Sequence, residues 1–233
     1  MTDVLVQGLQ VLLVLALAPL VTGYVRKIRA HLLRHRGPSL IQPYRDLMRL
    51  LHKEAVVADT ASWLFRVAPY LVVSAIWVAA AVVPTFATEL PFSRSADLIV
   101  IVALLGTARF FLALAGLDAG TGFGGIGTSR EIMIAALAEP AMLMVVFTLS
   151  LLAGSTQLST VVAFMSGPDV GVRISLALAL SGLILVGIAE SGRIPVDNPA
   201  TQLEITMVHE AMVLEYSGRH LAMIELASSL KLL

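Results

Sequence analysis

Five apolar runs, each about as long as a membrane span, follow one another along this chain. They cover residues 4–24, 67–87, 97–117, 131–153 and 172–191, and a sixth run begins near residue 220. A helix needs about 20 apolar residues to cross the hydrocarbon core of a bilayer. Only helices and closed barrels satisfy every backbone group in lipid, and the alternating segments typical of a barrel are absent from the sequence. The sequence therefore predicts an all-α, polytopic transmembrane helix bundle.

The composition agrees with a membrane protein. Hydrophobic residues make up 58% of the chain and charged residues only 14%, whereas soluble domains carry about 25% charged residues. Because this many spans pack more readily as one bundle than as separate units, we expect residues 1–233 to form a single integral membrane domain. The last run, LAMIELASSLKLL, is too short to cross a bilayer alone, so we expect this domain to be incomplete at its C-terminus.

Basic residues are concentrated between the first two runs, in the segment 25–66. The segments 88–96 and 154–171 are nearly free of Lys and Arg. By the positive-inside rule, 25–66 is a cytoplasmic basic loop and the N-terminus lies outside; 192–219 then becomes a cytoplasmic acidic loop, and 118–130 also lies inside. The positive charges follow the first run rather than precede it, which favours a retained span over a cleaved signal peptide.

The basic loop contains one amphipathic segment. Pro43 suits the first turn of a helix, and Tyr44, Leu47, Met48 and Leu51 then fall on one face. Such a helix can lie along the inner surface of the membrane. It would serve either as a lipid-headgroup anchor or as a docking surface for a cytoplasmic partner, and periodicity does not separate the two. The candidate docking residues are Arg34, Arg36, Tyr44, Arg45 and Arg49.

Cysteine is absent from the sequence. This excludes disulfides and thiolate-held iron–sulfur or zinc sites within this chain. We therefore expect no cofactor and no metal here, and any redox centre that works with the protein must belong to a partner.

A literal GxGxxG occurs at Gly120, Gly122 and Gly125. The dinucleotide-binding fingerprint needs a preceding strand and a βαβ unit, whereas apolar spans flank this segment on both sides. We instead expect the glycines to let a tight inner loop pack against its neighbours.

Several acids lie within or beside the apolar runs. Glu131 opens the fourth run, Glu139 lies about 12 Å deeper by helical rise, and Glu190 ends the fifth. Arg109, inside the third run, could pair with one of them, and Glu225 lies early in the sixth. Carboxylates inside a bilayer are costly and usually mark ion or proton routes. The pattern predicts a connected polar path whose buried carboxylates exchange protons.

Three segments carry a resemblance to a known family. The basic loop RKIRAHLLRHRGPSLIQPYRDLMRLLHKE, the block AESGRIPVDNPATQLE and the element LEYSG are similar to parts of the membrane subunit that respiratory complex I shares with energy-converting group 4 [NiFe] hydrogenases. In mitochondrial complex I this membrane subunit is called subunit 1. The residues that match the block AE-x-x-R-x-P-x-D-x-P are Ala189, Glu190, Arg193, Pro195, Asp197 and Pro199.

The residues of the first loop indicate a branch of that family. HRGPSLIQPYRDLMRLL and the HEAM stretch before LEYSG resemble formate hydrogenlyase and hydrogenase-4-type subunits. Complex I members usually carry an RxGPN version, where this chain has RGPS. The resemblance implies a bundle of about eight spans, of which this chain would cover the first six.

The resemblance also implies a function. It implies a membrane subunit, without its own redox centre, that anchors a peripheral electron-transfer arm and couples redox chemistry to proton or sodium translocation. Expected partners are the hydrogenase large and small subunits, a ferredoxin-like iron–sulfur subunit and antiporter-like membrane subunits, with [NiFe] and iron–sulfur clusters in those partners, all at a bacterial or archaeal cytoplasmic membrane. The candidate coupling residues are Glu131, Glu139, Glu190, Arg193, Asp197, Glu204, Glu210 and Glu215.

Three alternatives stay open. The chain could be the quinone-binding membrane subunit of a complex I-like NADH, ferredoxin or F420 dehydrogenase. It could be a free-standing secondary transporter, although inverted halves with broken helices are not found in the sequence. It could also be a plain anchor whose acids only hold loops together.

Overall fold

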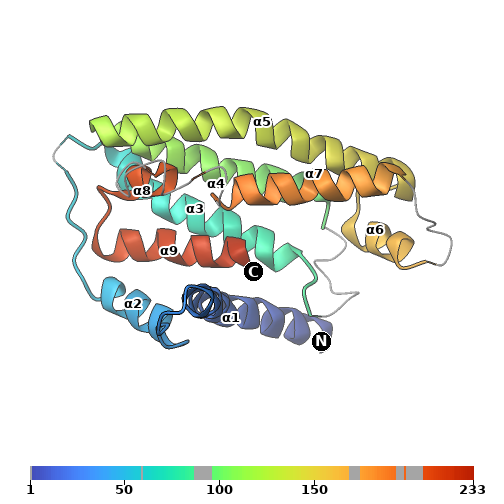
Figure 1. The fold of residues 1–233 in the computed structure, drawn as a ribbon, viewed down its shortest axis with the longest axis horizontal. Coiled ribbons are helices and arrows are strands. Elements are labelled where there is room, and N and C mark those ends of the chain that lie inside the picture. Colours follow the sequence, from blue (N-terminus) through green and yellow to red (C-terminus); the bar gives the residue numbers. More distant parts are fainter. Residues whose placement is uncertain (1, 59, 87–95, 168–173, 193–196, 198–206) are drawn as a thin grey trace.

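The computed structural model describes residues 2–58, 60–86, 96–167, 174–192, 197 and 207–233, and these residues are helical apart from their connections. Figure 1 shows the arrangement. The helices are α1 (Thr2–Leu32), α2 (Gln42–Leu51), α3 (Trp63–Val82), α4 (Leu98–Asp118), α5 (Gly122–Ala153), α6 (Leu158–Met165), α7 (Ile174–Glu190), α8 (Val208–Val213) and α9 (Gly218–Leu232). The all-α prediction is confirmed.

Four of these helices are long and apolar enough to cross a membrane. They are Leu5–Leu32 within α1, together with α3, α4 and α5. These helices contain most of the first four predicted runs. The fifth run becomes α7, an apolar helix of 17 residues, and the sixth becomes α9, of 15 residues.

The glycine-rich segment was wrongly predicted to be a loop over residues 118–130. Helix α5 begins at Gly122, because the Thr121 side chain accepts a hydrogen bond from the Gly124 N–H and so caps it. Gly127 lies so close to α8 that an added Cβ would come within 2.8 Å of the Ala211 Cβ. The predicted close packing is thus present, but inside a helix.

Helix α4 also fixes the start of α3. The Asp118 Oδ2 accepts hydrogen bonds from the Ser62 N–H, the Ser62 hydroxyl and the Phe65 N–H. These donors are backbone and side-chain groups at the N-terminus of α3, which no bond within the helix would satisfy. The two helices are therefore held in register at this end of the bundle.

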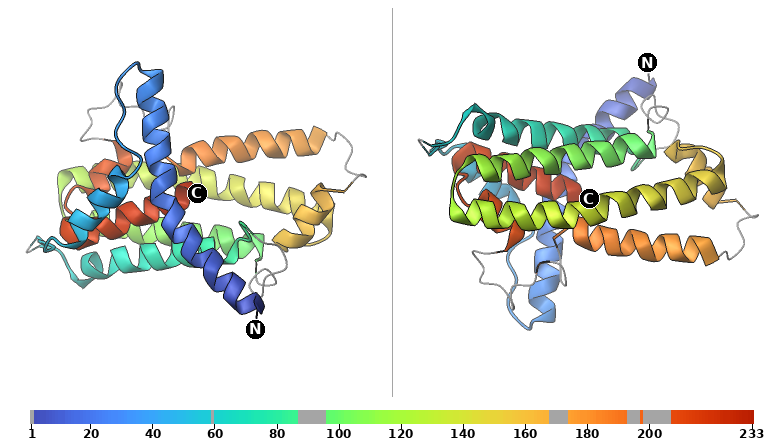
Figure 2. Two further views of the ribbon diagram at one scale, coloured as in Figure 1. Left: turned by 90° about the horizontal axis from the view of Figure 1, so that it is seen from below. Right: turned by 90° about the horizontal axis from the view of Figure 1, so that it is seen from above.

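The long helices α3, α4, α5 and α7 run side by side, and α9 packs against α3, α1 and α2. Figure 2 shows α1 crossing this layer at a steep angle instead of running along it. Small side chains dominate the core, including Ala18, Ala108 and Ala227. Small residues let membrane helices approach closely, which suits a bundle with no hydrophobic drive between helices.

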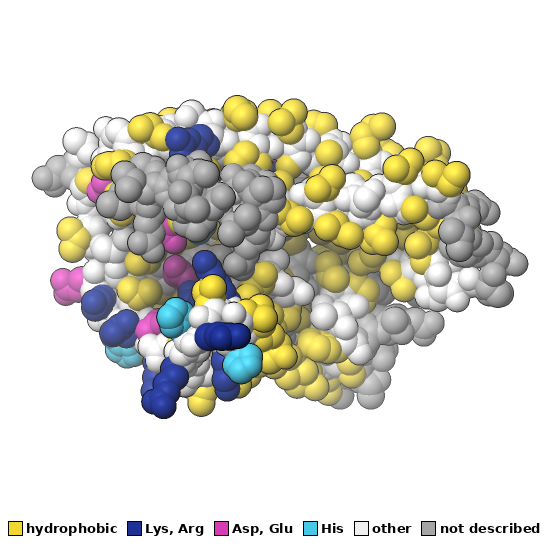
Figure 3. Space-filling model, viewed as in Figure 1, with side chains coloured by type: hydrophobic (Ala, Val, Ile, Leu, Met, Phe, Trp, Pro, Cys, Tyr) yellow, Lys and Arg dark blue, Asp and Glu magenta, His cyan; other side chains and the backbone are white. Residues whose placement is uncertain are grey.

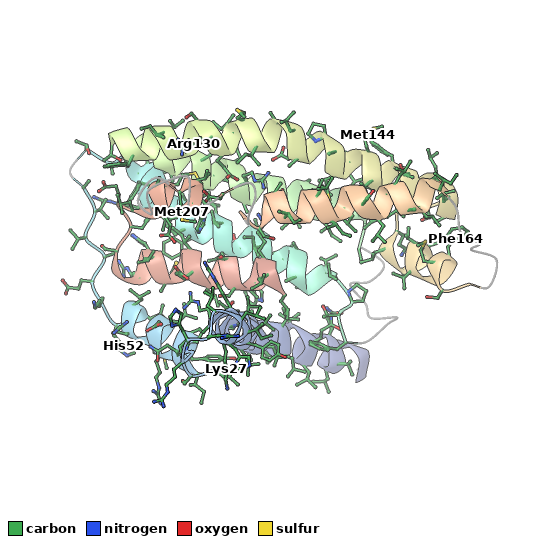
Figure 4. All side chains as sticks on the ribbon, in the orientation of Figure 1. Lys27, His52, Arg130, Met144, Phe164 and Met207 are labelled. Carbon is green, nitrogen blue, oxygen red and sulfur yellow. The ribbon has the colours of Figure 1, made fainter. Side chains whose placement is uncertain are left out.

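Charged and apolar side chains occupy different parts of the surface. Figure 3 shows Lys, Arg and His side chains gathered over α2 and the end of α1, while hydrophobic side chains cover the opposite end of this face. In Figure 4, Arg130, Met207 and His52 lie toward that charged end, whereas Met144 and Phe164 lie toward the other. On this face, charged side chains thus lie at one end of the bundle and hydrophobic side chains cover most of the rest.

Candidate functional site

A single arginine joins three helices inside the bundle. Arg109, on α4, places its Nε 2.8 Å from the Glu131 Oε1 on α5. Its Nη2 lies 2.8 Å from the Glu190 Oε1 at the end of α7. Because the Arg109 side chain is only 4% exposed, its positive charge has lost most of its water and depends on these carboxylates.

Helix α9 adds a second cation. The Lys231 Nζ lies 2.6 Å from the Glu190 Oε2, so Glu190 bridges Lys231 and Arg109. We call Arg109, Glu131, Glu190 and Lys231 the Arg109 cluster. It contains two cations and two carboxylates and is therefore balanced in charge. The guanidinium N–H groups approach their carboxylates closely without pointing along hydrogen-bond directions, so these contacts are ionic.

The Arg109 cluster borders a cavity of about 390 Å³. Helices α1, α3, α4, α5, α7, α8 and α9 all contribute to its wall. A polar cavity of this size can hold several water molecules, and it falls in the size range of small-molecule sites. Its ionisable lining residues are Arg26, Arg29, Arg109, Glu131, Glu190, Asp197, His209, Glu210, Glu225 and Lys231.

Asp197 is one of the most deeply buried acids in the described part of the chain, with 3% of the residue exposed. Its Oδ2 accepts a hydrogen bond from the Val208 N–H, 3.0 Å away, at the start of α8. Its Oδ1 is buried and has no hydrogen-bond donor among the described residues. Asp197 therefore holds α8 against the cavity through one carboxylate oxygen only.

His209 follows directly on α8 and also lines the cavity. Burial, and after it the positive charge of Lys231, lowers the pKa of His209 to about 4. The imidazole is thus neutral near pH 7, where it can both donate and accept a hydrogen bond.

The EYSG element fastens the start of α9. The Tyr216 hydroxyl donates a hydrogen bond to the Phe65 backbone oxygen, and the two rings stack with centroids 4.0 Å apart. The Ser217 hydroxyl accepts from the Val56 N–H and donates to the Val56 carbonyl. Gly218 has a φ of +52° and lies against the Glu54 carbonyl, where a Cβ would clash. These contacts set where α9, and with it Lys231, lies.

The eight candidate coupling residues are only partly brought together. Glu131, Glu190, Asp197 and Glu210 line the cavity. Glu139 instead lies in a separate groove between α4 and α5. Glu215 is half-buried between α8 and α9 and does not line the cavity, and Arg193 and Glu204 lie outside the described residues.

The two cations of the Arg109 cluster were not among the predicted coupling residues. Arg109 was expected only as a possible partner of an acid, and Lys231 was not singled out. The available signal was a positive charge within an apolar run, which is rare inside a membrane unless the charge is paired. The sequence could not show which acid each cation meets.

The candidate docking residues lie around α2. Pro43 lies in its first turn, as predicted, and the Tyr44 hydroxyl donates to the Ala16 carbonyl on α1. Arg49 pairs with Asp46 at 3.0 Å. The remaining three docking residues have exposed side chains, and they are Arg34, Arg36 and Arg45.

A family model described as NADH dehydrogenase matches residues 5–233. The chain is 35% identical to formate hydrogenlyase subunit 4 of Escherichia coli (strain K12) over 98% of this chain and 74% of that protein. It is 36% identical to hydrogenase-4 component C of the same organism over 95% of this chain and 69% of that protein.

Among solved structures, the membrane-bound sulfane sulfur reductase, an archaeal respiratory membrane complex, contains a chain of similar fold. The TM-score is 0.79 at 21% identity, and the match covers 100% of this chain and 75% of that one. The fold is therefore shared with a respiratory membrane complex. Together with the family match, these likenesses show that the chain belongs to the NADH dehydrogenase family, that of complex I subunit 1, and is similar within it to hydrogenase membrane subunits.

Proposed function

We propose that this chain is the membrane subunit of a complex I-like [NiFe] hydrogenase, related to formate hydrogenlyase, and that it couples redox chemistry in partner subunits to proton or sodium translocation. The likeness to the two hydrogenase subunits supports the class of complex. The observation that carries the coupling role is the shared carboxylate Glu190, held between Arg109 and Lys231 beside a polar cavity.

The proposed chemistry uses this chain's own side chains to hold and move charge. Two unit charges about 4 Å apart interact by roughly 4 kcal/mol at an effective dielectric constant near 20. Adding a proton to Glu190 would remove the negative charge between Arg109 and Lys231, and the two cations would then lack their common partner. Because Arg109 lies on α4 and Lys231 on α9, a proton at this atom changes the attraction between helices.

The partners would carry the metal centres. We infer hydrogenase large and small subunits and a ferredoxin-like iron–sulfur subunit on the side of α2, and antiporter-like subunits within the membrane. The exposed Arg34, Arg36 and Arg45 support an acidic partner surface on that side. In this arrangement the charged end of the bundle would face the cytoplasm of a bacterium or archaeon, with the N-terminus outside.

The experiment is to extract the tagged full-length protein from its membrane in mild detergent, identify the co-purifying subunits and assay nickel, iron and flavin. Nickel and iron together with a hydrogenase large subunit are the expected result. Flavin and quinone-dependent activity without nickel would contradict the hydrogenase assignment and favour the quinone-binding alternative. For that alternative, the 390 Å³ cavity is the space available to a quinone ring.

A further inference from the structure

A second groove, of about 270 Å³, lies between α4 and α5. It shares Arg109 and Glu131 with the cavity, but all its lining residues come from these two helices. Figure 2 shows α4 and α5 side by side on the surface seen from above. Phe110 is 59% exposed and Leu117 50% exposed at this groove, so no described part of the chain covers it.

Glu139 is the unusual member of this groove. It lies over Gly106 of α4, where an added Cβ would come within 3.4 Å of the Glu139 Oε1. Glu139 forms no hydrogen bond and no ion pair with another described residue. Arg109 and Lys231 are both engaged by carboxylates of the Arg109 cluster. The groove is therefore lined by one cation and two carboxylates, and Glu139 has no cationic partner among the described residues.

The depth of Glu139 in the membrane restricts which cation could pair with its carboxylate. Helix α5 runs from Gly122 to Ala153, so Glu139 lies close to its midpoint, about 25 Å from the helix start by helical rise. A lone charge at that depth is costly, and such groups pair in most membrane proteins. Lipid headgroups lie at the bilayer surface and cannot reach this depth, whereas a lysine or arginine on a neighbouring transmembrane helix can.

We propose that this groove binds a transmembrane helix of a partner subunit, and that this helix presents a lysine or arginine to Glu139. The proposal rests on the proposed function, which supplies a membrane partner. Three alanines and one glycine among the lining residues permit close helix approach. The bound helix would cover Phe110 and Leu117 and would extend the row of charges of the Arg109 cluster to a second subunit.

The first test uses the intact complex in its native membrane. Phe110 is replaced by the photo-crosslinking residue p-benzoylphenylalanine, and Leu12, an exposed residue on α1, is replaced in a matched control. The expected cross-link from position 110 joins a partner's transmembrane peptide that contains a Lys or Arg within one turn of the joined residue. A cross-link only to lipid, to a second copy of this chain, or to a helix without a basic residue would overturn the proposal.

The second test reverses the charge. Glu139→Lys should lower retention of that partner after detergent extraction by at least about tenfold, since like charges in contact cost several kcal/mol. The reciprocal Lys→Glu or Arg→Glu change in the partner should restore it, and Glu54→Lys, at an exposed site, should leave it unchanged. Normal retention with Glu139→Lys would refute the docking site. If hydrogenase subunits still co-purify in that case, the proposed function survives; if none co-purify with the wild-type chain, the proposed function itself fails.

Discussion

The Arg109 Nη2 lies 2.8 Å from the Glu190 Oε1, and this contact joins the middle of α4 to the last residue of α7. Each of the two groups would be costly to bury alone. The sequence separates them widely, so only the packing of the bundle brings them together. The position of α7 is therefore tied to a charge that a proton can remove.

Removing Arg109 should destabilise the bundle strongly. Arg109→Met keeps the bulk of the side chain but leaves Glu131 and Glu190 without their shared cation, and breaking a buried pair in this way costs about 3–5 kcal/mol. The temperature at which the detergent-solubilised complex loses its partners should fall. Arg66→Met, at an exposed position outside the candidate docking residues, is the control. An equal fall in that temperature in both variants would mean that the buried ion pairs stabilise the complex no more than an exposed arginine does.

Lys231 should affect coupling more than stability. In Lys231→Met, Glu190 retains Arg109 as a partner, so the complex should assemble with normal partner content. The number of ions moved per hydrogen turned over should fall, and Lys231→Arg, which keeps the charge, should restore most of it. A full ion yield with Lys231→Met would remove this lysine from the mechanism.

His209 should make stability depend on pH. Its pKa is about 4 in the folded chain, compared with 6.5 when unperturbed. Between these values the unfolded chain binds a proton that the folded chain does not, so stability falls as the pH drops from about 6.5 toward 4. Above 6.5 this residue has no effect. The measurement is the unfolding temperature of the protein as a function of pH. In His209→Gln this temperature should change less between pH 6.5 and pH 4. An unchanged slope would mean that other groups cause the pH dependence.

Gly218 should tolerate no side chain. Gly218→Ala adds a Cβ at a φ of +52°, against the Glu54 carbonyl, so it combines backbone strain with a clash. We expect low levels of assembled complex in membranes. Ser217→Ala, which loses two hydrogen bonds to Val56 without a clash, should reduce the level less. Immunoblots of native gels compare the two variants.

The spans were predictable because run length and apolarity alone decide which segments cross a bilayer. The start of α5 was not, since Gly122, Gly124 and Gly125 are typical of a loop and only the Thr121 cap and the packing on α8 show why a helix forms there. Helix α6 was missed for a related reason, because its eight residues are too short to show in a run-length pattern.

The acids of the site were predictable one by one, but their partners were not. Glu131 and Glu190 stood out as carboxylates at the ends of apolar runs. Lys231 resembles the common lysine near a helix end that reaches for water, and only the approach of α9 to α7 gives it a carboxylate. Glu139 shows the converse, since an acid expected on the same path lies in a different groove.

Ion movement per hydrogen turned over, measured in closed membrane vesicles, tests the central claim most directly. Glu190→Gln keeps the shape of the shared residue but removes its charge, and Glu54→Gln makes the same change at an exposed site. Coupling through the Arg109 cluster predicts that Glu190→Gln retains hydrogen activity while ion translocation is lost, with Glu54→Gln unchanged. An undiminished ion yield in Glu190→Gln would contradict that claim and leave the cluster as a structural anchor.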